Sequence, residues 1–145
     1  MSAELAEWVQ AYGEVGLAAA AFLGATLIPV SSEVAFVAAL KLDMAPAAAL
    51  LWASVGNVAG CIVNYVLGRW GRAAASDRLA TSRSGRAALA GVERWGFGAL
   101  ALSWAPIIGD PLTVVAGAAR IRFSLFVAVV GGLRVARYAL LLWLA

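Results

Sequence analysis

Four ionisable side chains stand in stretches of this sequence that are otherwise apolar. Glu33 and Asp110 each follow a proline by four residues, and Arg134 and Arg137 lie three residues apart in the last apolar stretch. Charged groups are costly inside a bilayer and occur there mainly beside a partner or a ligand. Because a guanidinium matches a phosphate through two parallel hydrogen bonds, the two arginines predict a site for an anionic head group.

Amide side chains form a second polar set. Asn57 and Asn64 recur with Gly56, Gly60 and Gly68 at spacings of about three to four residues, which places them on one face of a helix. The glycines allow a neighbouring helix to approach closely. The asparagines fit a role in packing and a role in lining a polar groove equally well, and we include both in the candidate site.

The ionisable groups also fit a structural interpretation, in which the two carboxylates neutralise the two arginines in a buried ion-pair cluster. Enzyme chemistry is not expected. The chain has no histidine and one cysteine, which excludes Ser-His and Cys-His pairs, a zinc site with imidazole ligands and an intrachain disulfide. We therefore predict no catalytic residue, no metal and no cofactor.

The composition indicates that membrane helices position these side chains. Of the 145 residues, 63% are hydrophobic and 13% are charged, against roughly 45 to 50% and 25% in soluble domains. About 20 apolar residues suffice to span a hydrocarbon core. We predict that residues 46–68 and 123–144 cross the membrane.

Two breaks interrupt the remaining apolar sequence, and each combines proline with an acid. The first contains Pro29, Ser32 and Glu33, and the second contains Pro106, Gly109, Asp110 and Pro111. Such breaks survive at membrane depth mainly where protein or a cavity surrounds them. Arms of about 8 to 14 residues would rise about 12 to 20 Å, roughly half the hydrocarbon core. Each break is therefore predicted to be the tip of a re-entrant hairpin.

The charge distribution predicts the topology. Residues 69–94 form an arginine-rich loop, which the positive-inside rule places in the cytoplasm. A second hairpin, unlike a second spanning helix, returns Arg120 and Arg122 to the same side. Residues 2–13 alternate aromatic and acidic side chains at helical spacing and are predicted to form an interfacial lead-in helix.

A shift of 77 residues aligns the two breaks. It places Pro29 on Pro106 and Glu33 on Asp110, and it also places Asn57 on Arg134. The predicted fold is an all-α integral membrane protein: an inverted repeat of two re-entrant helical hairpins, each followed by one transmembrane helix, plus the N-terminal interfacial helix. The boundaries within a single membrane domain, 1–145, are repeat 1 at about 15–68, the basic loop at 69–94 and repeat 2 at about 95–145.

Several short segments together carry a resemblance to a known family. They are Phe22-Leu23-Gly24-Ala25-Thr26-Leu27-Ile28-Pro29 with Ser32-Glu33, Gly56-Asn57 through Gly68-Arg69, Leu102-Ser103-Trp104-Ala105-Pro106 with Gly109-Asp110, Ala116-Gly117, and Leu133-Arg134 with Arg137-Tyr138. Together they resemble the DedA family, the bacterial members of the VTT (SNARE-associated) superfamily, and most closely its short YqaA-like branch. The resemblance covers nearly the whole chain.

The resemblance implies two facing re-entrant hairpins, a location in the bacterial inner (plasma) membrane and transbilayer movement of lipids. Undecaprenyl phosphate and phosphatidylethanolamine are the substrates attributed to larger relatives, and scrambling is attributed to eukaryotic ones. Larger members carry a glutamate in the first hairpin arm and two arginines in the second hairpin. This sequence has Ala21, Ser103 and Gly109 there, and Glu33 is its match to a family acidic position.

We therefore expect a lipid transporter of the flippase or scramblase type, open to proton coupling through its membrane carboxyls. The alternatives are a small ion or solute permease and a structural membrane partner protein. The expected partners are membrane lipids and not nucleic acid, because the basic residues lie in a loop beside membrane segments. A homodimer is also compatible with so short a chain, for example through the Gly56/Gly60 face.

Overall fold

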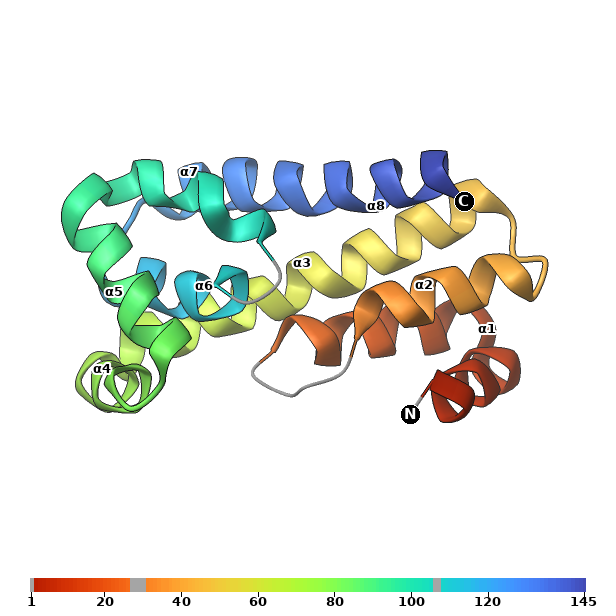
Figure 1. Cartoon of the computed structure of the whole chain (residues 1–145), viewed down its shortest axis with the longest axis horizontal. Helices are drawn as coiled ribbons and strands as arrows, with labels where there is room; N and C mark the ends of the chain where they lie inside the picture. The colour runs from red at the N-terminus through yellow and green to blue at the C-terminus, as the bar shows by residue number, and fades with distance from the viewer. Residues whose placement is uncertain (1, 27–30, 106–107) are drawn as a thin grey trace. The chain divides into compact units, whose positions relative to one another are not determined.

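The computed structural model describes residues 2–26, 31–105 and 108–145, and every regular element in this described part is helical. In chain order the elements are α1 (Ser2–Ala25), α2 (Ser32–Lys41), α3 (Pro46–Trp70), α4 (Arg72–Ala80), α5 (Arg83–Trp95), η1 (Gly96–Trp104), α6 (Gly109–Ala118), α7 (Phe123–Phe126), η2 (Val127–Gly131) and α8 (Gly132–Leu144). Figure 1 shows these elements as ribbons.

Both predicted crossings are helices that are long and apolar enough to span a membrane. One is α3, with 25 residues, and the other is the run Phe123–Leu144, with 22 residues, which comprises α7, η2 and α8. The second is not α-helical throughout, because η2 is a π-helical turn of five residues. Such turns are rare in helices and often lie at functional sites. This one ends just before the segment that carries Arg134 and Arg137.

The chain divides into two compact units, which are described separately. Unit 1 comprises residues 1–60 and 134–145, and unit 2 comprises residues 61–133. The first part of α3 belongs to unit 1 and its second part to unit 2.

Helix α1 of unit 1 bends sharply at Gly13. This residue has φ 56° and ψ −134°, a conformation with positive φ that glycine adopts without steric cost. Trp8 Nε1 donates a hydrogen bond of 3.1 Å to the carbonyl oxygen of Gly16 on the far side of the bend. Val9 is buried in the core of the unit. The predicted separation of a lead-in helix from the first hairpin arm is therefore confirmed, and the lead-in helix packs on the unit.

The first hairpin consists of the second part of α1 together with α2, which lie side by side (Figure 1). Small and aromatic side chains from both helices meet α3 and α8 in one core. Its buried members are Val9, Leu17, Ala20, Ala21, Ala35, Phe36, Ala39, Ala49, Ala53 and Tyr138. Six of the ten are alanines, and such small side chains let helix backbones approach closely in a membrane.

In unit 2, α6 packs backbone to backbone against the second part of α3. A Cβ atom added at Gly117 would lie 1.9 Å from the carbonyl oxygen of Tyr65, and one added at Gly68 would lie 2.0 Å from that of Val114. No side chain fits at these distances. The two helices are therefore in direct contact through their glycines.

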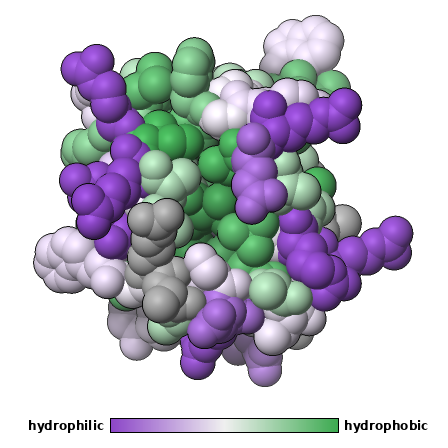
Figure 2. All heavy atoms as spheres, turned by 90° about the vertical axis from the view of Figure 1, so that its left-hand side faces the viewer, coloured by the Kyte–Doolittle hydropathy of each residue, from purple (hydrophilic) through white to green (hydrophobic). Residues whose placement is uncertain are grey.

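The arginine-rich stretch of unit 2, predicted as a loop, is mostly helical, which agrees with its content of alanine and arginine. It forms α4 and α5, and the hydroxyl of Ser82 caps α5 by accepting a 3.0 Å hydrogen bond from the Gly85 amide. Leu79 and Ala88 anchor the two helices in the core of the unit. Figure 2 views the side that carries α4 and α5, where hydrophilic side chains project at the margin and hydrophobic ones lie between them.

The first arm of the second hairpin is a 3₁₀ helix and not the α-helix implied by the alignment with the first hairpin. Its nine residues, Gly96–Trp104, extend about 18 Å at roughly 2.0 Å per residue. The α-helical arm of the first hairpin, residues 14–25, also extends about 18 Å at roughly 1.5 Å per residue. The tighter winding therefore gives a shorter segment the same reach.

The 77-residue shift found in the sequence recurs in the backbone. Helices α2 and α6 each have ten residues and begin 77 positions apart, at Ser32 and Gly109. Each is followed by a non-glycine residue with positive φ, Asp43 at 59° and Arg120 at 57°. The spanning helices then begin at the same offset, at Pro46 and Phe123. The local structure of the two halves therefore repeats at the same offset from the start of α2 and α6 to the start of the two spanning helices.

Candidate functional site

The candidate site of unit 1 is built on one face of α8. Arg134, Arg137 and Tyr138 are spaced at three and four residues, so their side chains project from the same side of the helix. Arg134 is 2% exposed and Tyr138 is fully buried, while the side chain of Arg137 is 13% exposed. Two guanidinium groups are thus held inside protein on a helix of membrane-spanning character.

Arg137 forms an ion pair with Glu33, the second residue of α2. The Ser31 hydroxyl orients the carboxylate by donating a 3.1 Å hydrogen bond to its Oε2 atom. A carboxylate in the first turn of a helix is also stabilised by the helix dipole. The Glu33 side chain is 34% exposed, so the pair can be reached from outside the protein core.

Tyr138 links the arginine face to the first hairpin. Its hydroxyl accepts a 3.1 Å hydrogen bond from Nδ2 of Asn57, and the same Nδ2 approaches the carbonyl oxygen of Ala21 at 3.5 Å. Tyr138 also lies within electrostatic reach of Glu33 and both arginines. Its ring packs on Phe36, with centroids 5.1 Å apart. The candidate residues Glu33, Asn57, Arg134 and Arg137 therefore belong to one polar cluster.

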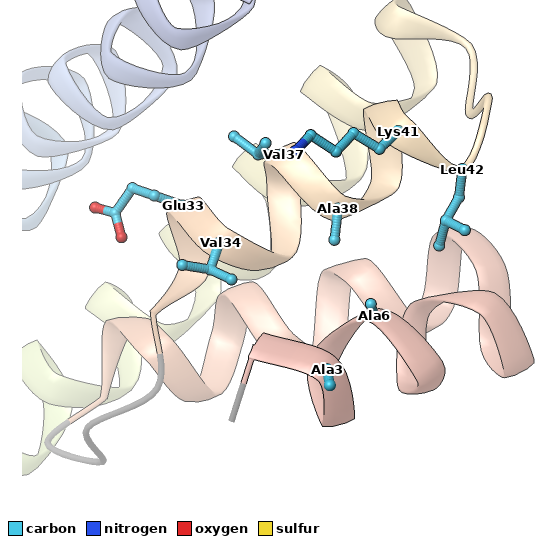
Figure 3. A pocket seen from close by; sticks show the side chains of 8 residues that line it. All are labelled: Ala3, Ala6, Glu33, Val34, Val37, Ala38, Lys41 and Leu42. Carbon is cyan, nitrogen blue, oxygen red and sulfur yellow. The ribbon is translucent and has the colours of Figure 1, made fainter.

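A groove leads to this cluster between the lead-in helix and α2. Its volume is about 540 Å³, and its walls are formed by Ala3, Ala6, Val34, Val37, Ala38 and Leu42, with Glu33 and Lys41 as the charged lining residues. Figure 3 shows Ala3 and Ala6 facing α2 across the groove, with Glu33 and Lys41 toward opposite ends of α2. The groove is therefore an apolar channel with the ion-paired carboxylate at one end.

The other two candidate residues, Asn64 and Asp110, belong to unit 2. Asn64 Nδ2 donates a 3.1 Å hydrogen bond to Oγ1 of Thr113, which in turn donates a 2.6 Å bond to the backbone carbonyl of Asp110. Asp110 is half-buried in the first turn of α6, where it occupies the same position as Glu33 does in α2. Asn64 thus ties α3 to the start of α6, and its observed contact is a structural one.

The predicted hairpin tips are placed only in part. Pro29 and Pro106 lie outside the described residues. Ser32, Gly109 and Pro111 were assigned to the tips but lie in the first turns of α2 and α6. The first-turn amide groups of a helix lack intrahelical partners, so a proline there costs no hydrogen bond and the helix can begin before it.

Three residues of the polar clusters were not predicted as site members: Ser31, which donates to Glu33, Tyr138 and Thr113. Tyr138 lies four residues after Arg134, a spacing that places both on one helix face and could have indicated it. Thr113 lies three residues after Asp110 and bonds back to its carbonyl. A threonine in an apolar helix gives no comparable signal.

The glycine face of α3 serves packing within the chain. A Cβ atom at Gly56 would lie 2.0 Å from the carbonyl oxygen of Ala18, and one at Gly60 would lie 2.6 Å from that of Phe22. The suggestion that this face joins two copies of the protein is therefore wrong, because the first hairpin arm already covers it.

Comparison with known proteins identifies a family and two similar bacterial proteins. The family model described as the VTT domain matches residues 12–133. The chain is 38% identical over 109 residues to "Inner membrane protein YqaA" of Escherichia coli (strain K12), covering 74% of this chain and 73% of the relative. It is 36% identical over 136 residues to an "Uncharacterized protein" of Haemophilus influenzae, covering 86% and 82% of the two chains. No solved structure shows significant similarity.

Proposed function

The chain belongs to the VTT domain family of the DedA superfamily, and from this premise we propose that it is a non-enzymatic lipid transporter. In this proposal it moves an anionic or phosphate-bearing lipid head group across the bilayer, as a flippase or scramblase. Its E. coli relative is named an inner membrane protein, and we propose the bacterial inner membrane as the location of this chain as well.

The observation that carries the proposal is the arginine pair on α8, with Arg137 bound to a partly exposed Glu33. Each arginine at the centre of a spanning helix costs about 2.5 to 3.5 kcal/mol on insertion scales. Apolar residues of similar volume often hold helices together as well as a buried ion pair does. A phosphate fits the same arginines, because it can replace the Glu33 carboxylate and accept two hydrogen bonds from one guanidinium.

The groove supplies a path for the lipid. Its apolar walls suit an acyl chain, while Glu33 at its end lies beside Arg137. A lipid could thus place its head group at the ion pair while its tail stays against Val34 and Val37 and in the bilayer. Displacement of Glu33 from Arg137 would free the carboxylate to bind a proton, which is the simplest route to proton coupling.

The repeat in the backbone supports the architecture that we propose for this transporter. Each half comprises a hairpin and one crossing, and an odd number of crossings per copy inverts the second copy in the membrane. We propose that the two hairpins are re-entrant, that they face each other, and that residues 2–12 form a helix at the membrane interface. In this arrangement residues 69–94 lie in the cytoplasm.

The decisive experiment measures transport of a fluorescent phospholipid in reconstituted vesicles. Arg137→Lys keeps the charge but loses the planar fork, and Glu33→Gln with Arg137→Gln removes the pair without leaving a lone buried charge. We expect both variants to slow transport by roughly 10- to 100-fold, since a hydrogen bond to a charged group contributes about 1.5 to 3 kcal/mol.

Arg83→Lys, at an exposed position of α5, is the matched control and should transport normally. Normal transport by the double Gln variant would instead support a structural ion pair and would rule out the site. Flux of a soluble ion without movement of lipid would indicate a permease.

A further inference from the structure

Unit 2 contains a second basic site, away from the arginines of α8 in the chain. A groove of about 580 Å³ is lined by Tyr65, Val66, Arg69, Arg120, Arg122, Phe123 and Ser124. Three of these seven residues are arginines, and the described lining contains no carboxylate. All three arginines are exposed. A hollow with this lining carries a strong local positive potential.

Tyr65 organises the groove. It is 2% exposed, and its hydroxyl donates a hydrogen bond to the carbonyl oxygen of Ile121. Arg69 Nη1 donates in turn to the Tyr65 hydroxyl at 3.4 Å. The Tyr65 ring packs on Phe123 and Phe126, with centroids 5.5 and 4.6 Å away. These contacts join the end of α3 to the bend that carries Arg120 and Arg122, so all three arginines line one groove.

The bend itself does not explain the basic residues. Arg120 has φ 57°, and the equivalent bend of the first half has Asp43 at 59°. Asn and Asp adopt positive φ more readily than most other residues. An aspartate therefore adopts the same backbone conformation in the first half of the chain. The conformation of the bend does not require a basic residue at position 120, so the positive charge there needs another explanation.

We propose that this groove binds a phosphate group, namely that of an anionic phospholipid at the cytoplasmic surface of the membrane. The groove lies where α3 ends at Trp70 and where the second spanning helix begins at Phe123, which is the level of lipid head groups. Basic pockets at helix ends on this side are known to suit anionic head groups. The site does not rest on the proposed transport function, because it would anchor a lipid equally well in a structural protein.

The test is lipid binding by native mass spectrometry of the detergent-solubilised protein. Phosphatidylglycerol and phosphatidylcholine compete as probes, and the readout is the preference for the anionic lipid. Each basic residue near a membrane surface contributes about fivefold to such attraction, so Arg120→Gln with Arg122→Gln should reduce the preference by roughly 30-fold. Arg78→Gln with Arg83→Gln removes the same charge from exposed positions of α4 and α5 and should leave the preference intact.

Two outcomes overturn the proposal. One is an equal loss of preference in both double variants, which indicates general electrostatic attraction; the other is an unchanged preference in the Arg120/Arg122 variant. A separate arm adds inorganic phosphate alone and follows thermal stability. Suppose that phosphate stabilises the wild type but not the Arg120/Arg122 variant, and that mass spectrometry shows no preference between the two lipids. This result would support a phosphate site and would assign it to free phosphate instead of a phospholipid.

Discussion

At the scale of single residues, Tyr138 matters as much as the charged groups around it. It lies at the centre of the unit 1 cluster, fully buried, with its ring against Phe36 and its hydroxyl on the amide of Asn57. A buried amide that loses its acceptor costs about 1 to 3 kcal/mol. The hydroxyl of Tyr138 therefore stabilises Asn57 inside the membrane, beyond any contact with a ligand.

A double-mutant cycle tests this pairing. Tyr138→Phe should lower the free energy of unfolding by about 1 kcal/mol because Asn57 loses its shorter hydrogen bond. Asn57→Ala combined with Tyr138→Phe should cost less than the sum of the single changes, with a coupling of roughly 0.5 to 3 kcal/mol. Tyr12→Phe, at a position 58% exposed, is the control. Strictly additive effects would show that the hydrogen bond does not contribute.

The sequence indicated the charged members of this cluster but not the tyrosine. Arginine and glutamate are rare in apolar helices and therefore conspicuous, whereas a tyrosine in the same place is ordinary. The pairing of Arg137 with Glu33 could not be predicted, because 103 residues lie between them and Asp110 offered a second carboxylate at the equivalent position. Only the packing of α2 against α8 selects the partner.

At the scale of elements, glycine contacts determine which helices touch. The approach of α6 to α3 through Gly117 leaves no room for a methyl group, whereas Gly132 of α8 has nothing within 4 Å of an added Cβ atom. Gly117 and Gly132 both lie in helices, and yet only Gly132 has room for the methyl group of an alanine.

Gly117→Ala should accordingly destabilise the protein by about 1 to 3 kcal/mol or more, because one of two packed backbones has to move. Gly132→Ala should be neutral or stabilising by roughly 0.5 to 1 kcal/mol, since alanine favours the helix. Unfolding of both variants in the same detergent gives the comparison. Equal tolerance at the two positions would contradict the close contact between α3 and α6.

The 3₁₀ winding of η1 is the element that the sequence could not indicate. Periods of 3.0 and 3.6 residues are distinguished by where polar side chains recur, and Gly96–Trp104 has one serine among apolar residues. The helical content of residues 69–94 was easier to predict, because alanine and arginine are strong helix formers.

At the scale of the whole molecule, α3 sets the topology. Its 25 residues extend about 37 Å at roughly 1.5 Å per residue, more than the hydrocarbon core of about 30 Å. The arginine-rich helices follow directly at its C-terminal end, and we propose from the positive-inside rule that this end lies in the cytoplasm. Composition alone was sufficient to predict the two membrane-spanning segments, and their orientation stays a prediction.

Thiol labelling in intact cells tests the orientation. Cys61 is 1% exposed and should not react, which provides a silent background. Ala47→Cys, in the first turn of α3, should react with a membrane-impermeant maleimide from outside, whereas Thr81→Cys, between α4 and α5, should react only after permeabilisation. Labelling of both positions from the same side would show that α3 does not cross.

The unequal winding of the two hairpins also has a mechanical consequence. If the nine residues of η1 rewound into an α-helix, the arm would shorten by about 4.5 Å, at a difference of roughly 0.5 Å per residue. The first arm of the first hairpin is already α-helical, so it cannot shorten in this way. The first arm of the second hairpin can therefore change its length by rewinding, whereas the corresponding arm of the first hairpin has a fixed length.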